Sequence, residues 1–105
     1  MIRSYLYPIL SLILLSLSVY AACPKHGTYV QTLGSHGPEL LGHAQSAYLI
    51  WHRGRARVLV DAGSGAALHF GRSGADLNDL VAITLSHLHT NHSNDMPSLV
   101  KHSFF

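Results

Sequence analysis

Short apolar runs alternate with turn-forming residues along most of the chain, after one longer apolar stretch near its start. Runs rich in β-branched and aromatic residues predict strands, and clusters of Gly, Pro, Asn, Asp or Ser predict the turns between them. The two later runs are almost continuously apolar, which is typical of strands buried on both faces. The predicted strands cover residues 28–33, 46–51, 57–60 and 81–85.

Glycine and capping residues predict how these strands are connected. Gly54 is expected to take a positive φ in a hairpin turn between the second and third strands. Asp76 is a suitable N-cap for a short helical turn, and Pro97 suits the first turn of a helix that Ser93 or Asn94 would cap. The helical segments are expected over residues 65–70, 76–80 and 95–101. This order of elements predicts a mixed α and β fold.

The first 22 residues have the pattern of a secretory signal peptide. A short segment carrying the positive charge of Arg3 precedes the apolar residues 6–19, and small residues follow at the expected cleavage point. We therefore expect residues 1–22 to be a signal peptide and the product to be exported, to the periplasm or outside the cell. An uncleaved membrane anchor is the alternative, although the apolar run is shorter than the roughly 20 residues of a spanning helix.

Cys23 is the only cysteine in the sequence and directly follows this segment. A bacterial lipoprotein would carry its acylated cysteine here, but Tyr20 is a poor residue at the third position before such a cysteine. Contact with a membrane is expected only if the signal stays uncleaved or Cys23 is lipidated. A single cysteine excludes an intramolecular disulfide and a four-cysteine zinc site, so histidines, carboxylates or water would have to hold any metal.

The charge balance is only mildly basic, with 7 Lys and Arg against 5 Asp and Glu. The basic residues form no stripe along the sequence, so no nucleic-acid partner is expected. Nine histidines among 105 residues permit metal affinity. His36 lies in a glycine-rich loop, where it faces either a substrate or solvent. The scattered histidines elsewhere, His43 among them, suggest no role.

Three histidines fall within six residues, directly after the last predicted strand: His87, His89 and His92. Imidazole is a common ligand of divalent transition metals. Alternate side chains of an extended segment share a face, so His87 and His89 can reach one metal, while His92 lies past a turn at a neighbouring position. The end of a buried strand is open to solvent, as a catalytic metal requires. A polar loop with surface histidines is the alternative.

His87-x-His89-x-Asn91-His92 resembles the His-x-His-x-Asp-His signature of the metallo-β-lactamase superfamily. Further segments are similar in the same order to the ribonuclease Z-like and arylsulfatase-like branches, namely residues 30–38, 46–50, 58–63 and 80–87. The resemblance implies an α+β fold, the first half of an αββα sandwich. Residues 23–105 would then be the N-terminal part of a truncated domain. Half a sandwich would expose apolar faces and be poorly stable without a partner.

The resemblance also implies roles for the residues of the motif. His87 and His89 would bind a first zinc ion and His92 a second, so one or two zinc ions are expected. Asn91 stands at the position of the family's catalytic Asp; an amide is a weak ligand and accepts no proton, which would weaken the second zinc and impair turnover. Asp61 would be a buried structural carboxylate near the site, with a catalytic role as the alternative.

Taken with the export signal, the resemblance implies an exported metal-dependent hydrolase. It would attack an ester-like or lactam bond of a small-molecule substrate through a metal-activated water. The later ligands of the family are absent from this sequence, so two alternatives stay open: a non-catalytic truncated remnant, and an exported His-rich metal-binding module. Whether this chain is an active enzyme stays open as well.

Overall fold

The computed structural model describes residues 26–104. The predicted signal peptide and Cys23 lie outside the described residues, so their assignment stays a prediction. No helix in the described range is long and apolar enough to cross a membrane. The elements are β1 (Thr28–Gly34), β2 (Ala47–His52), β3 (Arg55–Val60), α2 (Ala66–Arg72), the 3₁₀ turn η1 (Leu77–Asp79), β4 (Ala82–Thr84), α3 (Thr90–Ser93) and α4 (Met96–His102).

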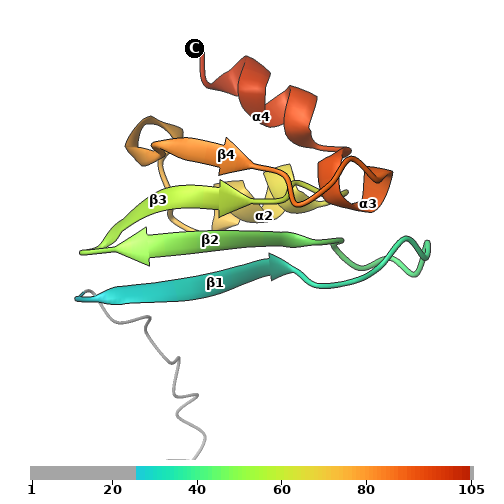
Figure 1. Cartoon of the computed structure of the whole chain (residues 1–105), viewed down its shortest axis with the longest axis horizontal. Helices are drawn as coiled ribbons and strands as arrows, with labels where there is room; N and C mark the ends of the chain where they lie inside the picture. The colour runs from blue at the N-terminus through green and yellow to red at the C-terminus, as the bar shows by residue number, and fades with distance from the viewer. Residues whose placement is uncertain (1–25, 105) are drawn as a thin grey trace, which may run out of the picture.

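One sheet organises the chain, with its strands in the order β1-β2-β3-β4. The first two pairings are antiparallel and the pairing of β3 with β4 is parallel. A parallel pair needs a crossover connection, which α2 and η1 provide here on one face of the sheet (Figure 1). The mixed α and β architecture predicted from the sequence is confirmed.

The core lies between this sheet and α2. Leu49 and Leu59 are opposite each other on β2 and β3 and are fully buried, and Phe70 of α2 is 5% exposed. Trp51 stacks on Tyr29 and donates from Nε1 to Oε1 of Gln31, at 2.8 Å. Burying a Leu side chain stabilises a fold by about 1.5–3 kcal/mol, so this small layer supplies most of the driving force.

The opposite face of the sheet carries a row of apolar side chains that crosses all four strands. Val30, Ile50, Val58 and Ala82 are successive partners in the register of the sheet. Val30 is 62% exposed and the other three are half-buried. The apolar row is therefore partly open to solvent within residues 26–104, as expected of half a sandwich.

The predicted strands agree with the structure to within two residues at each end, and the hairpin turn has Arg53 at φ 51° and Gly54 at φ 77°. Two positive φ values are what a two-residue hairpin loop requires. Asp76 caps η1 as predicted, because its side chain accepts a hydrogen bond from the Asn78 N–H at 2.8 Å.

The predicted cap of the last helix is wrong. Asp95 occupies the N-cap position of α4 without a side-chain cap bond, and Pro97 lies in the first turn as expected. Ser93 and Asn94 are the end of the unpredicted helix α3: the Ser93 hydroxyl donates to the His89 carbonyl at 3.0 Å, and Asn94 donates to the Ser64 hydroxyl at 2.9 Å.

Candidate metal centre

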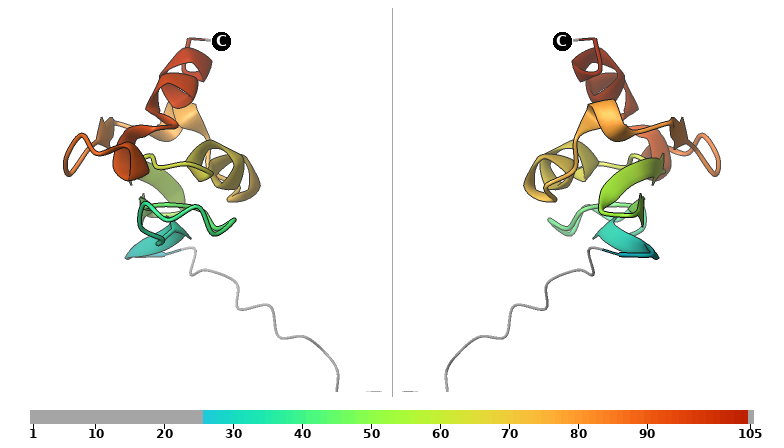
Figure 2. Two further views of the ribbon diagram at one scale, coloured as in Figure 1. Left: turned by 90° about the vertical axis from the view of Figure 1, so that its right-hand side faces the viewer. Right: turned by 90° about the vertical axis from the view of Figure 1, so that its left-hand side faces the viewer.

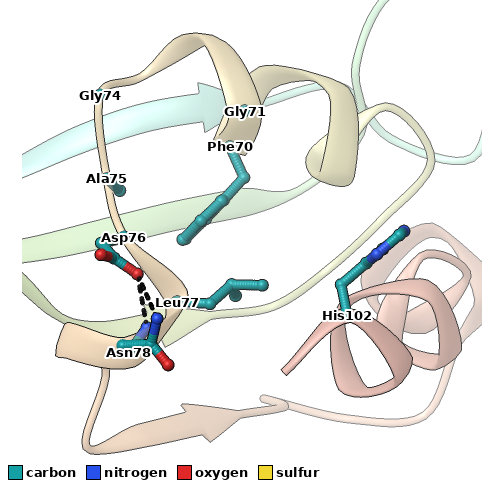
Figure 3. A pocket seen from close by; sticks show the side chains of 8 residues that line it. All are labelled: Phe70, Gly71, Gly74, Ala75, Asp76, Leu77, Asn78 and His102. Carbon is teal, nitrogen blue, oxygen red and sulfur yellow. Dashed lines mark hydrogen bonds between the residues drawn. The ribbon is translucent and has the colours of Figure 1, made fainter. Parts of the chain in front are cut away.

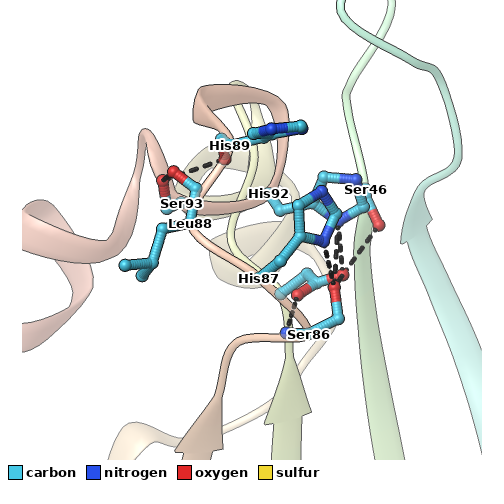
Figure 4. Close-up of polar contacts among 8 residues, drawn as sticks. Ser46, Ser86, His87, Leu88, His89, His92 and Ser93 are labelled. Atoms are coloured by element: carbon cyan, nitrogen blue, oxygen red, sulfur yellow. Dashed lines mark hydrogen bonds and ion pairs between the residues drawn. The ribbon is translucent and has the colours of Figure 1, made fainter.

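The parallel pairing of β3 with β4 brings the ends of these two strands together. β3 runs into Asp61, Ala62 and Gly63, and β4 runs into the histidine motif. The Asp61 N–H donates to the Thr84 carbonyl at 2.8 Å, so the parallel ladder continues up to the first residue of the site. Side chains that are far apart in the sequence meet here (Figure 4).

Asp61 is the centre of the hydrogen-bond network at these strand ends. It is 3% exposed and has a φ of 61°, in the left-handed region. Its carboxylate accepts from His92 Nδ1 at 2.6 Å, from the Ser86 N–H at 2.7 Å, from the Ser86 hydroxyl at 2.9 Å and from the Ser46 hydroxyl at 3.1 Å. Four donors compensate the burial of this side chain and hold its unusual backbone conformation in place.

These contacts set the ionisation of Asp61. Burial by itself raises the pKa of the Asp61 carboxyl, but the hydrogen bonds from His92, from the Ser86 N–H and hydroxyl and from Ser46 outweigh burial and bring the pKa below the ordinary value of 3.8. Asp61 is therefore a carboxylate near neutral pH and only accepts hydrogen bonds. The hydrogen in its contact with His92 must lie on Nδ1, so a neutral His92 ring would carry its free lone pair on Nε2.

His87 is held in a similar way through Ser86. The Ser86 hydroxyl donates to Asp61, and its oxygen lies 3.1 Å from Nδ1 of His87. Since the hydroxyl hydrogen points to Asp61, the His87 Nδ1–H donates to the Ser86 oxygen, and Nε2 of His87 is again the nitrogen left free. His89 is exposed and occupies the N-cap position of α3.

The three motif rings lie close to one another. The ring centroids of His87 and His89 are 4.6 Å apart with the planes at 75°, and those of His87 and His92 are 4.0 Å apart at 48°. Two imidazoles on one tetrahedral zinc ion, at a Zn–N distance of about 2.0–2.1 Å, place their centroids about 5.2 Å apart. Histidine is a residue type that zinc binds, but both centroid separations are shorter than that of two imidazoles on one tetrahedral zinc ion.

The rings do not converge on one point as they lie. Within residues 26–104, no group of three or more His, Cys, Asp or Glu side chains is arranged to hold one ion. The motif as it lies is therefore a cluster of three histidines and not a formed ligand set.

Asn91 is the buried residue of α3, at 9% exposure. Its backbone carbonyl lies directly on Gly63: a Cβ added to Gly63 would overlap that oxygen and lie 2.7 Å from Cβ of Gln45. The Ala62 N–H donates to the His92 carbonyl at 2.7 Å, and the Ala62 carbonyl accepts from the Asp95 N–H at 2.8 Å. The short helix is thus fixed onto the end of β3 by backbone contacts.

The structure brings together four predicted site residues, namely His87, His89, His92 and Asp61. It also adds Ser46 and Ser86, which sequence reasoning missed. Ser86 offered a weak signal as the polar residue between an apolar strand and a histidine, whereas nothing in the sequence marks Ser46.

A cavity of about 570 Å³ lies apart from the motif, against α2 and η1. Of the nine histidines, only His102 lines this cavity (Figure 3).

Comparisons with known proteins agree with this geometry. The family model for the metallo-beta-lactamase superfamily matches residues 40–105, which include the sheet from β2 onward and the motif. Among solved structures, the chain is similar to the metallo-beta-lactamase fold protein YhfI from Bacillus subtilis, with 31% identity and a TM-score of 0.59 over 69% of this chain. The match covers 30% of YhfI, so the chain spans less than a third of that protein. No curated protein matches.

The family model covers more than half of the chain, and the similar solved structure has the same fold. The resemblance read from the sequence is confirmed, as is the assignment to part of this α+β fold. The superfamily is one of metal-dependent hydrolase-type proteins. The chain belongs to the metallo-β-lactamase superfamily.

Proposed function

We propose that this chain is part of an exported, zinc-dependent hydrolase that attacks an ester-like or lactam bond in a small molecule. The observation that supports this proposal best is the gathering of three imidazoles at the end of β4, with one of them fixed by a buried carboxylate. Asp61 serves the fold as well, but its contact with His92 also orients one ring of the motif, as a carboxylate behind a metal-binding histidine does.

In this proposal His87 and His89 hold a first zinc ion and His92 belongs to a second. Asp61 and Ser86 keep Nδ1 of His92 and of His87 occupied, so that each ring offers Nε2 outward. When bound, a divalent ion at these residues would supply the Lewis-acid chemistry that activates water for hydrolysis near neutral pH. The protein's own part is to orient the rings and to leave the exposed side of the motif open to substrate.

Asn91 limits this activity in our proposal. Its amide has the shape of the family's carboxylate but no negative charge, and it neither binds a second cation strongly nor accepts a proton. The residue is buried in α3 against the end of β3. The carboxylate that Asn91→Asp introduces would therefore be desolvated, and a nearby cation would stabilise it.

Hydrolysis by three versions of the full chain tests the proposal: wild type, Asn91→Asp, and His87→Ala with His89→Ala. With zinc and a panel of nitrophenyl carboxylate, phosphate and sulfate esters and a chromogenic lactam, we expect Asn91→Asp to raise turnover by about tenfold or more, since general-base groups contribute about 10²–10⁴. The double histidine variant should lose zinc-dependent turnover.

Asn78→Asp is the matched control, because it makes the same amide-to-carboxylate change on exposed η1. It should leave turnover unchanged. If folded Asn91→Asp protein shows no zinc-dependent hydrolysis, the enzymatic proposal is wrong. Zinc binding that requires the motif without any turnover would favour the metal-binding module instead.

A further inference from the structure

Three arginines gather at the turn between β2 and β3. Arg53, Arg55 and Arg57 are three of the seven Lys and Arg residues of the sequence. Arg53 lies in the turn and is exposed, and Arg55 pairs with Asp79 of η1 at 3.4 Å while its side chain stays 67% exposed. Among the described residues, the side chains of Arg53 and Arg57 have no ion-pair or hydrogen-bond partner. Residues 53–57, the arginine hairpin, are therefore a cationic end of the sheet.

The turn itself does not require an arginine. Arg53 has a φ of 51°, in the left-handed region, and Gly54 follows at 77°. Asn, Asp and Gly adopt this conformation readily, whereas a residue with a long side chain is disfavoured in it. Because Asn would suit the turn better, an arginine at this position indicates a role for its charge.

The same end of the sheet receives the chain from its N-terminal segment. The Arg53 N–H donates to the Gly27 carbonyl at 2.9 Å, which ties the turn to the start of β1. This end lies on the left in Figure 1 and faces the viewer on the right of Figure 2. Only residues 20–25 separate the apolar residues 6–19 from His26, a distance of at most about 25 Å. If the apolar segment lies in a membrane, the arginine hairpin is therefore held within reach of the lipid headgroups.

We propose that the arginine hairpin docks on anionic lipid headgroups, with the apolar N-terminal segment as an uncleaved anchor. The guanidinium group matches phosphate oxygens with paired donors. Each basic residue near an anionic leaflet favours binding by about fivefold, so the two arginines that Asp79 does not offset favour the docked state by about tenfold or more. The histidine motif follows β4 at the opposite end of the sheet and faces away from the lipid. The proposal is independent of the hydrolase proposal, because it uses none of the residues of the motif.

Energy transfer from Trp51 tests this proposal in the full chain. Trp51 is the only tryptophan and lies two residues before Arg53, so transfer to a dansyl group on a lipid headgroup reports how near the hairpin lies to the surface. We expect stronger transfer on vesicles of phosphatidylcholine with phosphatidylglycerol than on phosphatidylcholine alone, and high salt should remove the difference. Arg53→Gln with Arg57→Gln should lower the ratio of docked to undocked hairpin by about tenfold or more, and Arg53→Gln alone by about fivefold.

Arg72→Gln with Lys101→Gln is the matched control, because it removes the same charge from exposed positions on α2 and α4. It should leave the transfer unchanged, and circular dichroism should show both double variants folded like the wild type. Equal transfer by the wild-type chain on the two kinds of vesicle would overturn the proposal. An equal loss in the control would overturn it too, because the net charge of the chain would then be responsible.

A second measurement reads the orientation of the anchored chain. In lipid discs that contain phosphatidylglycerol and a gadolinium chelate on a headgroup, the amide resonance of Gly54 should broaden more than that of Gly63, which follows the far end of β3. If Gly63 broadens as strongly as Gly54, another face of the chain meets the lipid and the proposal is wrong.

Discussion

Asp61 accepts a hydrogen bond from Nδ1 of His92 at 2.6 Å, across 31 residues of sequence. The contact joins the end of β3 to α3. Asp61 is only 3% exposed, and its carboxylate fixes the orientation of the partly exposed His92 ring. Orientation of a metal ligand by a carboxylate behind it is a recurring feature of zinc proteins. The same pair links the stability of the fold to the arrangement of the candidate site.

Replacing Asp61 should therefore destabilise the whole chain. Asp61→Ala leaves the donors of Ser46, Ser86 and His92 without their buried acceptor, and we expect the free energy of unfolding in urea to fall by about 2–4 kcal/mol. Asp79→Ala is the control: its ion pair with Arg55, at 3.4 Å, is largely solvent-exposed, so the loss should stay within about 1 kcal/mol. Equal losses in the two variants would contradict the central role of Asp61.

Acid should weaken the fold through the same carboxylate. The pKa of Asp61 in the folded chain is below its ordinary value of 3.8, so the unfolded chain takes up this proton first on acidification. The stability contributed by Asp61 should be complete above about pH 5, and it should shrink as the pH falls below about 4 toward the folded pKa.

The difference in unfolding free energy between wild type and Asp61→Asn, measured in urea at each pH below about 5, removes the contribution of titrating groups that do not contact Asp61. That difference should decrease on acidification. A difference that grows as the pH is lowered below about 4 would mean that the pKa of Asp61 is raised by folding.

Gly63 should tolerate no side chain. Gly63→Ala drives a methyl group into the Asn91 carbonyl and Gln45, and the backbone must shift. Overpacking of this kind costs about 1–3 kcal/mol, and we expect weaker zinc binding as α3 moves. Gly71→Ala in α2 is the matched control: open space surrounds its Cβ position, so helix propensity should stabilise the chain by about 0.5–1 kcal/mol. Urea unfolding and zinc titration of the two variants check both expectations.

Asp95 should stabilise a helix to which it does not belong. Its Oδ2 accepts the Ala67 N–H at 3.0 Å, in the first turn of α2, where α2 has no side-chain cap from its own N-cap residue. Asp95→Ala should lower the unfolding free energy by about 1 kcal/mol, and Asp95→Asn, which keeps an acceptor oxygen, should lose less. If Asp95→Asn were as unstable as Asp95→Ala, the contact would not act as a cap.

The features that could be predicted from the sequence are those that depend on a short stretch of neighbouring residues. Apolar runs located the strands, Gly54 marked the hairpin and the motif located the histidines, because each depends on neighbours within a few residues. The contacts of Ser46 with Asp61 and of Asp95 with Ala67 span 15 and 28 residues, and they arise only when the sheet and α2 are assembled. Local propensity also missed α3, a four-residue helix that backbone contacts with Ala62 and Gly63 hold in place.

The two backbone hydrogen bonds of Ala62 determine how the candidate site moves. Its N–H and carbonyl are both bonded to the segment around α3, although Ala62 lies outside every strand and helix. Its amide hydrogen should therefore exchange with solvent as slowly as those of β3, because exchange requires α3 to detach. The end of β3 and the histidine-bearing segment then open as one cooperative unit. A mutation that loosens this strand end would therefore make the three histidines more mobile, although all three side chains would still be present.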